Sequence, residues 1–176
     1  MALLRAINVG GRAPLAMADL RQAAERIGLR APRTLLQSGN LIFESAANAP
    51  PVLQTRLESE LAAAFALETS VLVRSAAEWR ALVADLPFPD VARADPSHLI
   101  AMPLRVAPDV AQQAALAAAI SGRERAAVVG ATAYIVYPDG IGRAKLTAAR
   151  IERHLGTLGT CRNWRTVRKI ELMLGC

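Results

Sequence analysis

The sequence lacks the residues that most often indicate a disulfide framework, a zinc site or a base-stacking surface. It has only two cysteines, Cys161 and Cys176, too few for structural zinc, and we expect reduced thiols. Aromatic residues make up only 4% of the chain, which gives poor support for base stacking of the RNA-recognition type. No run of about 18 residues is free of charge, which excludes a membrane span.

Catalytic signatures are missing as well. The chain contains no Walker A loop, no G-x-G-x-x-G, no G-x-S-x-G and no H-E-x-x-H. His98 and His154 neither adjoin a cysteine nor lie four residues apart, so a histidine-rich metal site is excluded and a catalytic triad is disfavoured. Cys161 adjoins Arg162, but no general base is visible nearby, so a packing role is favoured over a nucleophilic one. The sequence therefore identifies no catalytic residue and no cofactor.

Positive charge is concentrated near the end of the chain. Residues 141–176 hold eight basic and two acidic side chains, which accounts for the whole net charge of +6, while residues 1–140 are balanced. This asymmetry predicts an anionic partner, whether a phosphate-bearing molecule, nucleic acid or an acidic protein surface. A solvated basic helix face is the open alternative. The first residues show no basic segment leading into an apolar one, so we expect no secretory signal and a soluble, cytoplasmic protein.

Hydrophobic spacing divides the chain into two halves with the same order of elements. In the first half we expect a strand, a helix, a hairpin, a helix, a strand and an extra helix opened by a capping box, at residues 3–9, 17–27, 34–44, 53–65, 71–73 and 75–86. In the second half we expect the same series, with a weak closing strand, at residues 98–104, 110–120, 125–137, 147–155, 157–161 and 162–174.

Each half thus follows the βαββαβ order of a ferredoxin-like unit. We predict an α+β protein of two ferredoxin-like βαββαβ repeats, each followed by an extra helix. Residues 87–96 interrupt all periodicity, so they mark the expected boundary. The N-terminal repeat with its extra helix then covers residues 1–88, and the C-terminal repeat with its terminal helix covers residues 96–176.

Four short segments carry polar and glycine residues that packing does not require: residues 3–12, 37–40, 138–145 and 161–166. Glycines leave backbone amides open to a ligand, and arginine, lysine and asparagine add donors. The loop at 138–145 leads into an expected helix N-terminus at Thr147. Helix N-termini in general favour anions, because their backbone N–H groups are unpaired. We therefore predict a binder of a phosphate- or carboxylate-bearing small molecule, in a site shared by the two repeats. The predicted ligand-binding residues are Arg5, Asn8, Gly10, Gly11, Ser38, Asn40, Arg143, Lys145, Arg162 and Asn163.

Two other functions stay open at this stage. The basic segment 141–176 is compatible with non-specific nucleic-acid binding, although the scarcity of aromatic residues supports it weakly. Open sheet edges or the last helix are compatible with a protein-interaction module, including a homodimer. Trp164 falls in phase with Val167 and Ile170, so we expect it to pack in the core.

The segments LLRAINVGGR, QSGN, YPDGIGRAKL and TCRNWRTVRKIELM resemble, in that order, the motifs of domain of unknown function family 1697, a bacterial family. The resemblance covers almost the whole chain and implies a duplicated ferredoxin-like fold without implying an activity. Two positions depart from the family pattern: Ala6 replaces a glycine, and Ala144 replaces the serine before Lys145. A mechanism that needs that hydroxyl is therefore disfavoured here.

Overall fold

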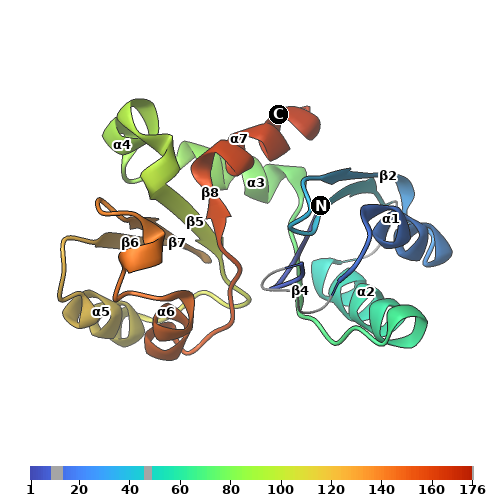
Figure 1. The fold of residues 1–176 in the computed structure, drawn as a ribbon, viewed down its shortest axis with the longest axis horizontal. Coiled ribbons are helices and arrows are strands. Elements are labelled where there is room, and N and C mark those ends of the chain that lie inside the picture. Colours follow the sequence, from blue (N-terminus) through green and yellow to red (C-terminus); the bar gives the residue numbers. More distant parts are fainter. Residues whose placement is uncertain (9–13, 46–48, 176) are drawn as a thin grey trace. The chain divides into compact units, whose positions relative to one another are not determined.

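The chain forms two compact units in a computed structural model that describes residues 1–8, 14–45 and 49–175 (Figure 1). Unit 1 comprises Met1–Trp79 with Ile170–Cys176, and unit 2 comprises Arg80–Lys169. Helices α3 (Ala76–Ala84) and α7 (Trp164–Met173) each contribute residues to both units. The units and the two sequence repeats are therefore different divisions of the chain.

Unit 1 contains the first ferredoxin-like sheet. Its elements, in chain order, are β1 (Ala2–Leu4), α1 (Met17–Arg26), β2 (Arg30–Leu35), β3 (Asn40–Glu44), α2 (Pro50–Phe65) and β4 (Val71–Val73). The strands are antiparallel in the order β2-β3-β1-β4, so the two strands that are each followed by a helix, β1 and β3, lie in the middle. This is the strand order of a βαββαβ unit, as predicted.

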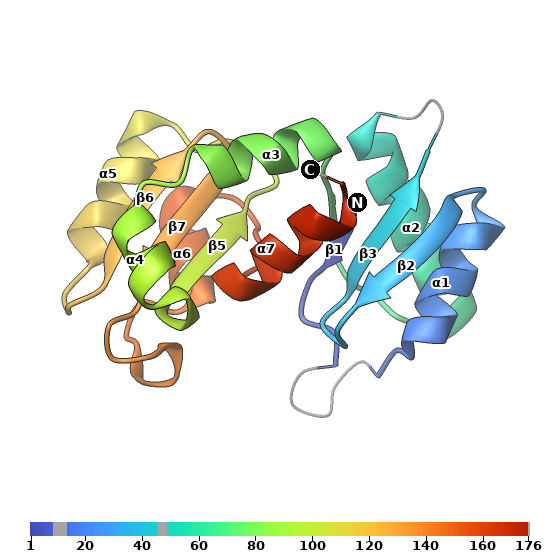
Figure 2. The same ribbon diagram turned by 90° about the horizontal axis from the view of Figure 1, so that it is seen from above.

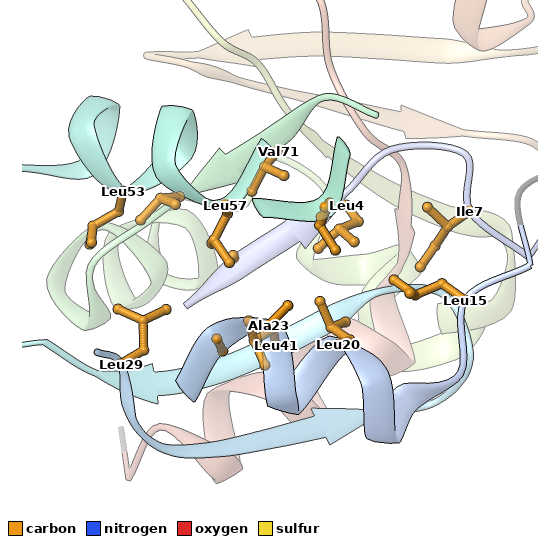
Figure 3. Close-up of a cluster of buried hydrophobic side chains, with 14 of the residues drawn as sticks. Leu4, Ile7, Leu15, Leu20, Ala23, Leu29, Leu41, Leu53, Leu57 and Val71 are labelled. Carbon is orange, nitrogen blue, oxygen red and sulfur yellow. The ribbon is translucent and has the colours of Figure 1, made fainter. Parts of the chain in front are cut away.

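Helices α1 and α2 cover one face of this sheet (Figure 3). Leu20, Ala23 and Ala24 share one side of α1 because they are three and four residues apart, and all are fully buried. Leucines repeat every four residues along α2 and pack onto Leu4 and Val71 of the sheet. Each such leucine contributes about 1.5–3 kcal/mol by leaving water.

Unit 2 repeats the arrangement. Its sheet and helices are β5 (Leu99–Pro103), α5 (Val110–Ala119), β6 (Arg125–Val129), β7 (Thr132–Val136), α6 (Ala148–Leu155) and β8 (Arg162–Asn163). The sheet order is β6-β7-β5-β8, again antiparallel, so the prediction of two ferredoxin-like repeats is confirmed. The Asp109–Gln112 capping box begins α5 and the Thr147 hydroxyl caps α6, which fixes both helix starts.

The two central strands of unit 2 are buried on both faces, since every residue of β5 and β7 is buried. Ile100, Met102 and Ile135 point toward α5 and α6, where they join one core cluster. The alternate residues face the other side, which is covered by α4 (Pro89–Ala94) and by the unit 2 parts of α3 and α7 (Figures 1 and 2). The hydroxyl of Tyr134 donates to the Leu82 carbonyl of α3 across 2.6 Å and so fixes this second layer.

Several boundaries differ from the sequence prediction, among them the start of β2, which is Arg30 and not residue 34. Strand β1 ends at Leu4 rather than near residue 9, because Ala6 and Asn8 adopt positive φ angles of 53° and 54°. The closing strand of the second repeat is Arg162–Asn163 rather than 157–161, where only Gly159 forms an isolated bridge to Leu104. Helix α7 consequently begins at Trp164.

The segment 87–96 is also more ordered than its lack of periodicity suggested. It contains α4, whose first residue is Pro89, and it leads into the short 3-10 helix η1 (Pro96–His98). Proline fits the first position of a helix because its missing N–H has no partner there. Among the helices of the described segments, none combines the length and the apolar character needed to cross a bilayer.

We predict that Tyr134→Phe lowers the free energy of unfolding by about 1–2 kcal/mol, because the buried Leu82 carbonyl loses its donor while the packing is kept. Urea denaturation of the variant measures this. A change within about 0.5 kcal/mol, as for ordinary surface substitutions, would show that the hydroxyl does not fix α3.

Candidate functional site

The first two motif segments meet in unit 1, where Gly39 packs against the end of β1. The Leu4 amide donates to the Gly39 carbonyl across 2.8 Å. Gly39 has a φ of +71°, and a Cβ at this position would lie 2.7 Å from Leu4 Cβ and 2.8 Å from Ile7 Cδ1. The turn therefore requires glycine for its conformation and for its close approach to the strand.

Asn8 joins three backbone groups through its side chain. Its Nδ2 donates to the carbonyls of Leu15 (2.9 Å) and Gln37 (2.8 Å), and its Oδ1 accepts from the Leu15 amide (2.8 Å). Asparagine also tolerates the positive φ found here. Asn8 thus links the segment after β1, the segment before α1 and the hairpin turn.

The remaining described residues of these two segments also form internal contacts. Asn40 is fully buried, and its Nδ2 donates to the Leu35 carbonyl (2.8 Å) and to Ser38 Oγ (3.1 Å). The backbone of Arg5 bonds to residues that precede β4, since its amide donates to Ser70 and its carbonyl accepts from the Thr69 hydroxyl. Local structure therefore explains Asn8, Ser38, Gly39 and Asn40 without a ligand. Gly10 and Gly11 lie outside the described residues.

Arg162 and Asn163 stabilise β8. Arg162 is buried, and its Nη1 donates to Thr160 Oγ1 and to the Cys161 carbonyl, both at 2.8 Å. Burial lowers its pKa to about 10, so the guanidinium stays charged at neutral pH. Asn163 donates to the Ser97 carbonyl and accepts from the Arg165 amide. Arg162 thus lies in β8 and not in the first turn of the last helix, where the sequence prediction of a helix over 162–174 placed it.

The glycine-rich loop of unit 2 lines a pocket of about 220 Å³. Arg143, at the end of the 3-10 helix η2 (Ile141–Arg143), and Lys145 are exposed and line it together. The hydroxyl of Tyr137 donates to the Leu146 carbonyl across 2.9 Å, which ties the loop to the end of β7. Two cations and a glycine-rich turn therefore surround one cavity.

Two carboxylates in this pocket already have partners. Asp139 pairs with Arg123 at 2.7 Å, and Glu124 Oε1 accepts from the backbone amides of Lys145 (3.2 Å) and Leu146 (3.5 Å). These hydrogen bonds lower the pKa of Glu124 below its ordinary value: the bond from the backbone amide of Glu124 itself has the largest effect, and the bonds from Leu146 and Lys145 add to it. The amides of Lys145 and Leu146, which a phosphate-binding loop would offer to its ligand, are thus occupied. Within the described residues, the lining cations outside an ion pair are Arg143 and Lys145.

A carboxylate with two hydrogen-bonding neighbours, which the sequence did not indicate, lies directly before η1. The Asp95 carboxylate accepts a hydrogen bond from the Ser97 hydroxyl and contacts His98 Nδ1. These contacts, that of Ser97 first, lower the pKa of Asp95. Because serine and histidine bind the same carboxylate, the serine proton is directed to Asp95 rather than to the imidazole. The cluster therefore does not have the arrangement of a catalytic triad.

A larger groove of about 850 Å³ lies on unit 2 between α3, α4 and α7. Four of its lining residues are basic: Arg93, Arg165, Arg168 and Lys169. The groove was not predicted from the sequence, because α4, which forms one of its walls, was not predicted. The segments that the structure describes contain no group of three or more His, Cys, Asp or Glu suited to a metal ion.

Comparison with known proteins agrees with this fold. A family model described as protein of unknown function (DUF1697) matches residues 1–134. A solved structure, described as that of conserved bacterial protein SP0830 from Streptococcus pneumoniae, has a TM-score of 0.72 at 24% identity and covers 98% of this chain and 96% of that chain. This structural likeness is one of fold. No curated protein matches the sequence significantly.

We predict that Gly39→Ala costs about 2–4 kcal/mol of unfolding free energy, because a strained φ is combined with a clash against Leu4 and Ile7. Gly130→Ala is the matched control: its φ is +53°, but a Cβ there meets no atom within 4 Å, so we expect a cost of about 1 kcal/mol. Equal losses in urea denaturation would contradict the packing role of the QSGN turn.

Proposed function

The chain belongs to the DUF1697 family of proteins of unknown function, and we propose that it binds a small phosphate- or carboxylate-bearing molecule in the loop pocket of unit 2. The observation that carries the proposal is the charge on the pocket wall. Arg123 is paired with Asp139, whereas Arg143 and Lys145 line the same cavity as exposed cations outside the described ion pairs.

The size of the pocket limits the ligand. About 220 Å³ is below the roughly 300–1,000 Å³ of sites for drug-sized molecules. The pocket therefore favours inorganic phosphate, a short phosphate ester or a small carboxylic acid over a dinucleotide.

The side chains, rather than the backbone, supply the attraction in this proposal. Glu124 accepts from the amides of Lys145 and Leu146, so a ligand would be held by the guanidinium of Arg143 and the ammonium of Lys145. Guanidinium binds two oxygens of a phosphate or carboxylate in a fork, and ammonium acts as a point charge. Because both cations are exposed, binding should weaken as salt is raised.

The proposed site retains only part of the set predicted from the sequence. Arg143 and Lys145 line the pocket, whereas Asn8, Asn40 and Asn163 use their side chains in bonds within their own units. The proposal is one of binding and includes no reaction or cofactor. Nucleic-acid contact through residues 141–176 is the alternative, and a mixed oligonucleotide in the experiment below tests it.

We predict that inorganic phosphate or citrate binds at this loop and that Arg143→Ala and Lys145→Ala each weaken it at least about tenfold. Glu124→Gln should strengthen binding about three- to tenfold, because it removes a negative charge from the pocket and keeps the oxygen that accepts from the loop amides. Chemical shifts of the loop amides, followed by NMR during titration, measure each affinity.

Arg153→Ala is the control, since Arg153 is exposed on α6 and does not line the pocket. It should bind as the unaltered chain does. The proposal fails if chloride at equal ionic strength causes the same shifts, or if all four variants bind alike. Oligonucleotide binding that survives Arg143→Ala and Lys145→Ala would favour the nucleic-acid alternative instead.

A further inference from the structure

The groove of about 850 Å³ differs from the loop pocket in having a largely apolar wall. Its uncharged lining residues come from the end of α3, from α4 and its flanks and from the start of α7: Val83, Leu86, Pro89, Ala92, Pro96 and Trp164. Helix α4 contributes no buried residue, so the apolar side chains that it adds to the wall stay at least partly exposed. Water is displaced favourably from such a wall by an apolar ligand.

The charged part of the lining is all positive. Arg165 lies three residues before Arg168 and four before Lys169, so these side chains share one face of α7, and α4 adds Arg93. None of the ten lining residues is Asp or Glu. Two acidic residues of the neighbouring segment 87–96 are engaged elsewhere: Asp90 with Arg125, and Asp95 with Ser97 and His98.

This combination restricts the ligand. A hydrophilic anion such as phosphate would satisfy the cations but leave the apolar wall in water. A neutral or cationic hydrocarbon would cover the wall but leave like charges close together on α7, which is unfavourable. Trp164 is only 4% exposed, so its ring is not available as a platform for a nucleic-acid base.

We propose that this groove binds a free, long-chain organic anion, with its alkyl chain on the apolar wall and its carboxylate or phosphate head beside Arg93, Arg165 and Lys169. The volume lies within the range of small-molecule sites. The site is separate from the loop pocket, because the two share no lining residue. A negative result at one of these sites therefore does not contradict the proposal for the other.

The test uses dodecanoate below its micellar concentration, with Trp164 as the reporter. The chain has two tryptophans, so Trp79→Phe leaves Trp164 alone, and calorimetry on the unaltered chain gives the affinity if that variant does not fold. We expect saturable binding at one site. Affinity should rise about two- to fourfold per methylene from octanoate to dodecanoate, and a dodecanoate chain carrying bromine should quench Trp164.

Charge-reversal variants distinguish binding in the groove from a general attraction of anions to a basic protein. Arg93→Glu/Lys169→Glu should weaken dodecanoate binding at least tenfold, and Ala92→Phe should weaken it by filling the groove. Arg150→Glu/Arg153→Glu changes the net charge equally on α6, outside the groove, and should bind normally. Circular dichroism checks that each variant is folded.

Four results would overturn the proposal. If butyrate binds as tightly as dodecanoate, charge alone explains the binding and the apolar wall has no role. If dodecyltrimethylammonium binds as tightly, apolar burial alone explains it and the cations have no role. Equal losses in the groove and α6 double variants would show that no specific site exists. Binding to phosphatidylglycerol vesicles without binding of free dodecanoate would identify a membrane surface instead.

Discussion

The sheet of unit 2 must be covered on both faces, and the main features of this unit follow from that constraint. A ferredoxin-like unit supplies only two helices, α5 and α6, which cover one face, while β5 and β7 are buried throughout. The second layer comes from helices that follow each repeat, and the Tyr134 hydroxyl holds one of them to the sheet. A short α4 completes this layer with side chains that stay at least partly exposed. The groove thus lies where three helices of unequal length cover this face of the sheet.

The basic residues that cause the charge asymmetry of the sequence lie at several different places in the structure. Of the eight basic residues in 141–176, Arg162 is buried in β8, Arg143 and Lys145 line the loop pocket, three line the groove, and the others lie on α6. Only the pocket carries its own carboxylates, Asp139 and Glu124. Our two proposals therefore assign a small anion to the wall that holds carboxylates and an amphipathic anion to the wall that is largely apolar, although arginine and lysine line both.

Element order was predictable because long periodic segments, such as the leucines of α2, report the buried face directly. The roles of the motif residues were not. Asn8 looks like a ligand donor in sequence, but its partners are backbone groups of Leu15 and Gln37, which only the fold brings close. Likewise, β8 has two residues and is defined by pairing with Ile100 and Ala101, and Glu124 reaches the loop amides of residues more than twenty positions away.

The measurement that tests this account most directly is an amide NMR map of the whole chain with phosphate and with dodecanoate in separate titrations. We expect two sets of shifted amides in unit 2: phosphate should shift those near 138–146, and dodecanoate should shift those near 83–96 and 164–169. The segments 5–8 and 37–40 should stay unchanged in both, because their polar side chains serve the fold of unit 1. Shifts centred on those segments, or one common set for both ligands, would contradict it.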